Sequence, residues 1–310
     1  MKLGYIGLGR MGKNMVLRLL EHGIEVVAWN RSKEPVEEVV KAGAIGAETI
    51  KDLVSKLETP RIIWLMLPAG EVTDQHIDEL IPLLSPGDLV IDGANSFYKD
   101  SLRRAEKLAE KGINFMDIGV SGGPKGARNG ACLMIGGNEE DFKKIEPLAK
   151  AAAAPGAYQY LGPAGSGHFA KMVHNAIEYG MMESIGEGLA ILKFSQFKYD
   201  FVKLLDLYNH RSVIESRLVG WAKEAFEEDS KLSDTSSVIG SGGAGTQRVK
   251  AEGDWTVDLA KELGVDTPVL EDSMKVRSES AAIPEDSPNG FRNKVISALR
   301  GKFGQHAVKK

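Results

Sequence analysis

The strongest constraint on the fold of this 310-residue chain is a glycine-rich turn close to its N-terminus. The apolar run Lys2–Ile6 leads into the hexapeptide Gly-Leu-Gly-Arg-Met-Gly at residues 7–12. A stretch of helical periodicity follows as far as Leu20, and Ile24–Trp29 is a second apolar run. This strand–turn–helix–strand order within about thirty residues predicts a parallel α/β sheet that binds a dinucleotide at the turn.

Each glycine of the turn has its own steric role in this interpretation. Gly7 permits the tight turn, Gly9 lets a pyrophosphate approach the backbone, and Gly12 lets the helix pack closely on the strand. Unpaired N–H groups at the start of the helix then face the phosphates. The alternative is a purely structural turn, which the position of the motif between a strand and a helix disfavours.

The end of the second strand indicates which dinucleotide the chain prefers. Proteins that bind NAD usually carry Asp or Glu there to hold the ribose 2′-hydroxyl. This chain has Asn30-Arg31-Ser32 instead, so no carboxylate repels a 2′-phosphate, and Arg31 and Ser32 can donate to one. We expect NADP as the cofactor, with the use of NAD left open. The alternative is that Arg31 lies on a solvated turn.

Further strand and helix units extend the predicted sheet. Apolar strands end at two small polar clusters, Asn95-Ser96 and Ser121-Gly122-Gly123. Ligands of a doubly wound sheet bind at the carboxyl ends of its strands, although Gly, Asn and Ser are also ordinary turn residues. Two such clusters at one edge favour a ligand cleft.

The glycine-rich segment 162–167 marks a domain boundary, because the periodicity that follows it is almost wholly helical. The predicted fold is therefore an α/β Rossmann-type N-terminal domain over residues 1–165, followed by an all-α C-terminal domain over residues 166–310. A second glycine-rich segment, Gly240–Gly245, lacks the Lys-Ser/Thr of a phosphate loop and is interpreted as a linker.

The first helix of the second domain carries an unusual polar stripe. Five polar residues recur at i, i+3, i+4, i+7 and i+8, which places them on one face: Lys171, His174, Asn175, Glu178 and Tyr179. Apolar residues cover the rest of the helix, so the stripe is either a solvated face or the wall of a ligand site. Lys171 and Glu178 are about 10 Å apart along the axis and can serve as base and acid on one small substrate.

Composition narrows the function further. The net charge of −4 gives no basic field for nucleic acid or a membrane surface, and no apolar run is long enough to span a bilayer. The one cysteine, Cys132, is expected to be buried in a strand. The N-terminus enters a strand directly, which predicts a cytoplasmic protein. No His, Cys, Asp or Glu spacing indicates a metal site, so none is expected.

The motifs together resemble the β-hydroxyacid dehydrogenase family over essentially the whole chain. The glycine turn, the segment Val120–Gly123 and Lys171 with Asn175 carry this broad resemblance. The string His-Asn-Ala-Ile-Glu-Tyr-Gly at residues 174–180 is similar to the substrate helix of the short 6-phosphogluconate dehydrogenases in that family. The tail from Arg300 to His306 is similar to the closing motif of the same group.

This resemblance implies roles for the stripe and the tail. Lys171 would take the proton of the substrate 3-hydroxyl, and Glu178 would protonate C1 after decarboxylation. The other implied substrate-binding residues are Ser121, Gly122, Gly123, His174, Asn175, Tyr179, Arg300 and His306. The expected cofactor-binding residues are Gly7, Leu8, Gly9, Met11, Gly12, Asn30, Arg31, Ser32, Leu67 and Asn95. Tail residues of the family come from a neighbouring subunit, which implies a homodimer or homotetramer.

One position departs from the family pattern. Glu215 stands where the family commonly has an arginine for the substrate phosphate, and Arg211, Arg217 or Arg300 could substitute for it. The leading hypothesis is an oxidative decarboxylation of a phosphorylated sugar acid. The alternatives are a dehydrogenase for an unphosphorylated β-hydroxyacid, such as 3-hydroxyisobutyrate or tartronate semialdehyde, and a non-catalytic nucleotide-sensing scaffold.

Overall fold

The computed structural model describes residues 1–240, 252–304 and 308. It divides into two compact units, Met1–Met172 and Val173–Lys310. Helix α8 (Ser166–Phe194) is continuous through the division. The first unit holds a sheet and the second is helical, so the predicted fold class is confirmed.

The first unit is built on a sheet of eight strands in the order β3-β2-β1-β4-β5-β6-β7-β8. The strands are β1 (Lys2–Ile6), β2 (Glu25–Trp29), β3 (Ile45–Gly46), β4 (Ile62–Leu65), β5 (Leu89–Asp92), β6 (Asn114–Ser121), β7 (Ala131–Gly137) and β8 (Ala153–Gly162). All adjacent pairs from β3 to β6 are parallel, as the alternation of strands and helices predicts.

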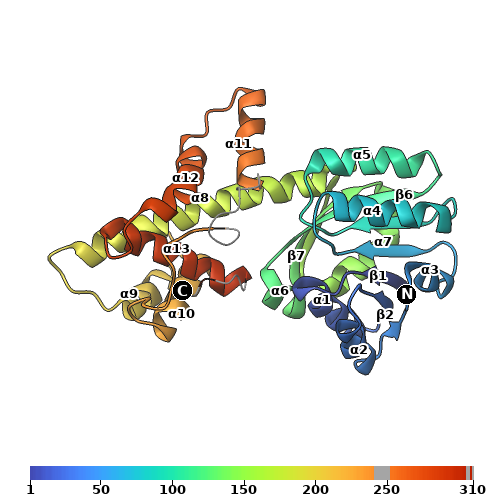
Figure 1. Ribbon diagram of the computed structural model, residues 1–310, viewed down its shortest axis with the longest axis horizontal. Coiled ribbons are helices and arrows are strands. Elements are labelled where there is room, and N and C mark those ends of the chain that lie inside the picture. The colour runs from blue at the N-terminus through green and yellow to red at the C-terminus, as the bar shows by residue number, and fades with distance from the viewer. Residues whose placement is uncertain (241–251, 305–307, 309–310) are drawn as a thin grey trace. The chain divides into compact units, whose positions relative to one another are not determined.

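Helices cover both faces of this sheet (Figure 1). Residues of α1, α2 and α7 pack on one face, and residues of α3, α4 and α5 pack on the other. The strands contribute side chains to the apolar cores on both faces. In β1, Leu3 and Tyr5 belong to the core on the first face, and Ile6 belongs to the core on the second. The helices and one 3₁₀ turn are α1 (Arg10–Glu21), α2 (Glu34–Lys41), α3 (Ile50–Ser55), α4 (Glu71–Leu80), η1 (Ile81–Leu83), α5 (Tyr98–Ala109), α6 (Gly123–Asn129) and α7 (Glu139–Ala152).

The sheet departs from a fully parallel arrangement at β7, which runs antiparallel to β6. The connection from Ser121 to Ala131 holds only the short helix α6, whereas a parallel crossover needs about a dozen residues or more. Cys132 lies in β7 as expected, but its side chain is exposed, so the prediction of a buried thiol is wrong. The alternation of the strand buries Ala131 and Leu133 and turns Cys132 outward.

The second unit packs its helices around one apolar core. Met182 of α8, Phe226 of α10 and Phe291 of α13 are among its buried members. The further helices are α9 (Phe201–Tyr208), α10 (Arg217–Glu228), α11 (Glu252–Leu263), α12 (Pro268–Glu279), the 3₁₀ turn η2 (Ser280–Ala282) and α13 (Pro288–Gly304). Among the described helices, none is long and apolar enough to cross a membrane.

Candidate active site

The glycine turn has the geometry that a dinucleotide requires. Gly7 has a φ of +100°, and a Cβ there would lie 2.3 Å from the Met66 carbonyl oxygen. A Cβ at Gly12 would lie 2.0 Å from the Gly7 carbonyl oxygen, so helix α1 approaches the turn at a distance that only glycine allows. A Cβ at Gly9 would meet no atom within 4 Å. The backbone is therefore tightly packed at Gly7 and Gly12, whereas the space beside Gly9 is open to a ligand.

The start of α1 is suited to bind phosphate oxygens. No side chain caps it, and its first turn holds no acidic residue. Asn30 supports the turn from the end of β2, because its Oδ1 accepts a hydrogen bond from the Leu8 amide at 2.9 Å. Its Nδ2 donates to the Ser32 carbonyl at 3.1 Å. The side chains of Arg31 and Ser32 are exposed beside this junction.

Arg104 links the two loops that carry Leu67 and Asn95. This fully buried guanidinium donates to Asp92, the last residue of β5, and to Ser96 in the loop that follows, at 2.8 and 2.9 Å. It also donates to Asp74 of α4 and to the Gly70 carbonyl after β4, at 2.7 and 3.1 Å. The loops at two carboxyl strand ends are therefore held together. Sequence reasoning missed Arg104, which reads as an ordinary helical arginine.

Lys171 is held against the sheet by a contact that needs glycine. A Cβ at Gly119 of β6 would lie 2.4 Å from the Lys171 Cβ. Asp117, two residues earlier on β6, accepts hydrogen bonds from the backbone N–H groups of Gly165 and His168, at 2.6 and 2.7 Å. The strand thus fixes the first turn of α8, and Lys171 is 8% exposed one turn later.

The predicted cluster Ser121-Gly122-Gly123 lies at the end of the same strand. Ser121 is the last residue of β6, two residues beyond Gly119. Gly122 and Gly123 have φ values of +120° and +61° and lead into α6. Positive φ at both positions strongly favours glycine, so the motif has a backbone cause beside any role in binding.

In the second unit, the stripe on α8 is tied together by local contacts. The Nδ1 of His174 lies 3.1 Å from the Asn175 Oδ1 and 3.9 Å from a carboxylate oxygen of Glu178. Asn175 is buried, and Glu178 is partly buried. The helical prediction for the stripe is confirmed, and its side chains are not simply solvated.

Tyr179 forms the centre of a cationic cluster in the second unit. The guanidinium of Arg277 on α12 stacks over its ring, 3.8 Å from the ring centroid. Arg300 on α13 is 8% exposed and donates to the Gly240 carbonyl at 2.8 Å. Burial lowers the pKa of Arg277 to about 10, and the nearby charge of Arg300 lowers it too. Burial likewise lowers the pKa of Arg300 and raises that of Tyr179.

Position 215 and the two arginines nearest to it in sequence are exposed. Glu215 accepts a hydrogen bond from the Arg211 backbone N–H at 2.8 Å, in a turn rather than a helix. Arg211 is exposed, and Arg217 is exposed with its guanidinium 5.0 Å from the Trp221 ring centroid. The guanidinium that stacks on Tyr179 is that of Arg277. Which arginine takes the place of the one expected at 215 stays a prediction. Sequence reasoning missed Arg277.

The expected contribution of tail residues from a neighbouring subunit stays a prediction, and Arg300 also lies near site residues of its own chain. Charge interactions of Arg300 with Tyr179 and Glu178 arise within one chain, since α13 belongs to the same unit. His306 lies outside the described residues. Among the described residues, no three His, Cys, Asp or Glu side chains converge as a metal site would require.

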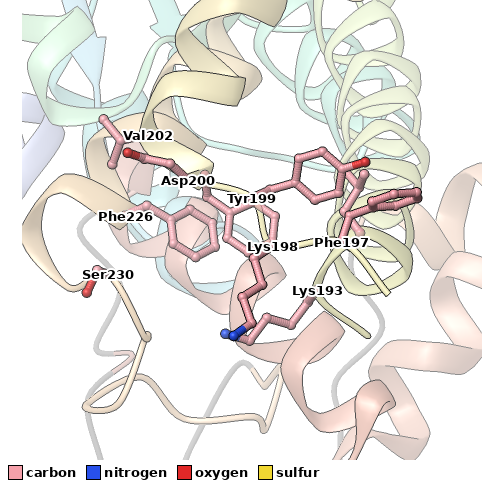
Figure 2. A pocket seen from close by; sticks show the side chains of 10 residues that line it. Lys193, Phe197, Lys198, Tyr199, Asp200, Val202, Phe226 and Ser230 are labelled. Carbon is pink, nitrogen blue, oxygen red and sulfur yellow. The ribbon is translucent and has the colours of Figure 1, made fainter. Parts of the chain in front are cut away.

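A separate cavity of about 390 Å³ lies at the end of α8 (Figure 2). Its lining includes Lys193, Lys198, Asp200 and Phe226, and none of the predicted site residues. Lys193 follows Glu178 by about 22 Å along the helix axis. This cavity is therefore distinct from the polar stripe.

Comparisons with known proteins bear on the identity of the chain. The family model described as the NAD binding domain of 6-phosphogluconate dehydrogenase matches residues 2–162. The model of the 6-phosphogluconate dehydrogenase C-terminal domain matches residues 167–302. The two models together span both units.

Individual relatives agree with this result. The Bacillus subtilis protein YqeC, provisionally named a 6-phosphogluconate dehydrogenase, is 43% identical, with 100% of both chains covered. The NAD⁺-dependent, decarboxylating 6-phosphogluconate dehydrogenase of Haloferax volcanii is 39% identical and covers 99% of this chain and 98% of its own. The Plasmodium falciparum 6-phosphogluconate dehydrogenase, solved with NADP⁺ and with 6-phosphogluconate, has a TM-score of 0.79 at 30% identity, covering 96% of this chain and 70% of that one. The chain therefore belongs to the 6-phosphogluconate dehydrogenase family and is an NAD(P)-dependent dehydrogenase.

Proposed function

We propose that this protein oxidises and decarboxylates 6-phosphogluconate to ribulose 5-phosphate and CO₂ with reduction of NADP, as in the pentose phosphate pathway. The arginine cluster at Tyr179 carries the proposal. The Nη2 of Arg277 is buried and has no hydrogen-bond partner among the described residues. The guanidinium groups of Arg277 and Arg300 repel each other and are partly desolvated, so a bound anion would stabilise both. A phosphate can accept hydrogen bonds from each of them.

The polar stripe supplies the proton transfers of this reaction. Lys171 would take the proton of the 3-hydroxyl, and a nicotinamide held at the glycine turn would supply the acceptor for the hydride from C3. The protonated Lys171 then polarises the new ketone, so the electrons of the breaking C1–C2 bond flow into an enediol as CO₂ leaves. Glu178 delivers a proton to the carbon that lost CO₂, and Lys171 takes back the proton that it gave to the ketone oxygen, which gives ribulose 5-phosphate.

The remaining residues of the stripe and strand end hold the substrate in this proposal. Carboxylate and hydroxyl oxygens need short polar partners, and these come from β6 and α8. The residues concerned are Ser121, Gly122, Gly123, His174 and Asn175. Tyr179, Arg277, Arg300 and His306 bind the phosphate.

For the cofactor, we infer a preference for NADP. The exposed Arg31 and Ser32 at the end of β2 are placed to donate to a 2′-phosphate, and the segment holds no carboxylate. Asn30 acts indirectly here, since its side chain is engaged with Leu8 and Ser32. The relatives named above include an NAD⁺-dependent enzyme and one solved with NADP⁺.

We also infer that the protein is a homo-oligomer. A cavity of about 730 Å³ in the second unit has a largely apolar lining, and several of its side chains are exposed. Exposed apolar members include Ile177, Met181, Val213, Ile214 and Val269. A second copy of the chain is the occupant that the family resemblance implies, and it would remove this surface from water.

The proposal is tested by following reduced nicotinamide with 6-phosphogluconate and, in separate reactions, NADP or NAD. We expect turnover with both, faster with NADP, and little with 3-hydroxyisobutyrate. Lys171→Met should lower kcat by about 10³-fold while NADP still binds, because a general base is lost. Turnover of 3-hydroxyisobutyrate but not of 6-phosphogluconate would show that the proposed substrate is wrong. Full turnover by Lys171→Met would contradict the mechanism.

A further inference from the structure

Glu183 is a buried acid that the proposed mechanism does not use. It follows Tyr179 by one turn of α8 and is 6% exposed. Both of its carboxylate oxygens are buried without a hydrogen-bond partner among the described residues. Buried polar groups in native proteins nearly always have partners, so this exception requires a cause.

Charged side chains on three helices of the second unit act on Glu183. Arg277 of α12 and Arg292 of α13 lower the pKa of Glu183, and Glu187 of α8 raises it. Burial has the largest effect and raises the pKa to about 7. Arg292 donates instead to the Asn293 Oδ1, at 3.0 and 3.1 Å. Glu183 therefore interacts electrostatically with both arginines, but its carboxylate forms no hydrogen bond with either.

Arg277 connects this acid to the phosphate site. Its guanidinium stacks on Tyr179 and interacts electrostatically with Glu183 as well. When the cluster holds no anion, the charge of Arg277 favours an ionised Glu183. A phosphate at Arg277 neutralises that charge and repels a second anion nearby, so the protonated acid becomes the favoured form.

We propose that Glu183 is a positioning residue of the phosphate site that takes up one proton from solvent when a phosphate binds at Arg277. The inference rests on the proposed function, because it needs a phosphorylated ligand at Tyr179. The neutral acid leaves the full charge of both arginines to the phosphate. The ionised acid weakens their hold. Substrate affinity should therefore fall as the pH rises above neutrality, although the phosphate itself stays a dianion.

Calorimetry tests this directly. 6-Phosphogluconate is titrated into the enzyme at pH 7.5 in two phosphate-free buffers that differ in ionisation enthalpy. We expect the wild type to take up about half a proton or more per site and Glu183→Gln to take up almost none. The control, Glu106→Gln, removes an exposed acid of α5 in the first unit and should behave as the wild type.

Kinetics give a second readout that a purely structural role would not change. Between pH 6.5 and 8.5, the KM of the wild type for 6-phosphogluconate should rise by about sixfold or more relative to Glu183→Gln, with parallel kcat profiles. Equal proton uptake by the wild type and Glu183→Gln would overturn the role of Glu183 and leave the proposed function standing. Absence of any 6-phosphogluconate binding to the wild type, with NADP still bound, would overturn both.

Discussion

The guanidinium of Arg277 stacks on Tyr179, and its Nη2 is buried without a described hydrogen-bond partner. A hydrogen bond to a charged group contributes about 1.5–3 kcal/mol. Arg277→Ala should therefore raise the KM for 6-phosphogluconate by about 30-fold, with a smaller change in kcat. Steady-state kinetics at saturating NADP measure both constants. Arg217→Ala, which removes an exposed arginine beside Trp221, is the control and should leave KM unchanged. An unchanged KM in Arg277→Ala would show that Arg277 does not bind the substrate phosphate.

The same residue marks the limit of prediction from sequence. Periodicity was enough to place Lys171, Glu178 and Tyr179 on one face of α8, because one helix fixes their spacing. Arg277 belongs to another helix, and only tertiary packing brings it onto Tyr179. No local pattern separates it from the exposed Arg217. The family pattern directed attention to position 215, where the structure has a turn.

Glu183 should also make stability depend on pH. The pKa of its carboxyl is raised in the folded state from 4.5 to about 7, so the folded protein binds the proton more tightly than the unfolded chain. This contribution is fully present below pH 4.5 and is lost as the pH rises through 7. Relative to the wild type, the free energy of unfolding of Glu183→Gln should increase by about 3 kcal/mol between pH 5 and pH 8.

Urea unfolding at the two pH values measures this difference, and a constant offset from the buried amide does not affect it. Glu106→Gln serves as the control, because its carboxylate is exposed on α5. A difference between Glu183→Gln and the wild type that stays the same at both pH values would show that Glu183 does not titrate near neutrality.

At the scale of elements, the start of α8 depends on Asp117. This fully buried carboxylate accepts hydrogen bonds from the Gly165 and His168 backbone N–H groups. Asp117→Asn turns one acceptor into a donor that faces an N–H group. We expect a loss of about 2 kcal/mol in the free energy of unfolding, measured with urea. Asp100→Asn affects only a solvent-exposed pair with Arg103 and should change stability by less than about 0.5 kcal/mol. Equal losses in the two variants would contradict the anchoring role.

The elements themselves were largely predictable, because strands and helices leave local patterns. The strands expected at Lys2–Ile6 and Ile24–Trp29 are present, and the polar stripe lies on one long helix, α8. The two-residue strand β3 is too short to leave such a pattern. The direction of β7 and the exposure of Cys132 follow from the length of the α6 connection and from pairing within the sheet. Neither feature can be predicted from a short segment of sequence.

At the scale of the whole molecule, the two units differ in how completely one chain covers their apolar surface. The cores of the first unit lie between sheet and helices. In the second unit, Ile177 and Met181 of α8 are 55% and 42% exposed, and Ile214 is 55% exposed, all beside one apolar cavity. Sequence periodicity could not reveal this, since apolar residues on α8 were expected to be buried within the chain.

A homo-oligomer formed through this surface should be sensitive to charge placed in it. The double variant Met181→Glu/Ile214→Glu would bury two unpaired carboxylates at the interface, at a cost of several kcal/mol. Light scattering coupled to size-exclusion chromatography should therefore show an oligomer for the wild type and a monomer for the variant. Val40→Glu, at a 42% exposed position on α2 of the first unit, should keep the wild-type mass. A monomeric wild type would refute the homo-oligomer. An oligomeric double variant would show that the interface lies on another surface, because a packed apolar contact could not accept both unpaired charges.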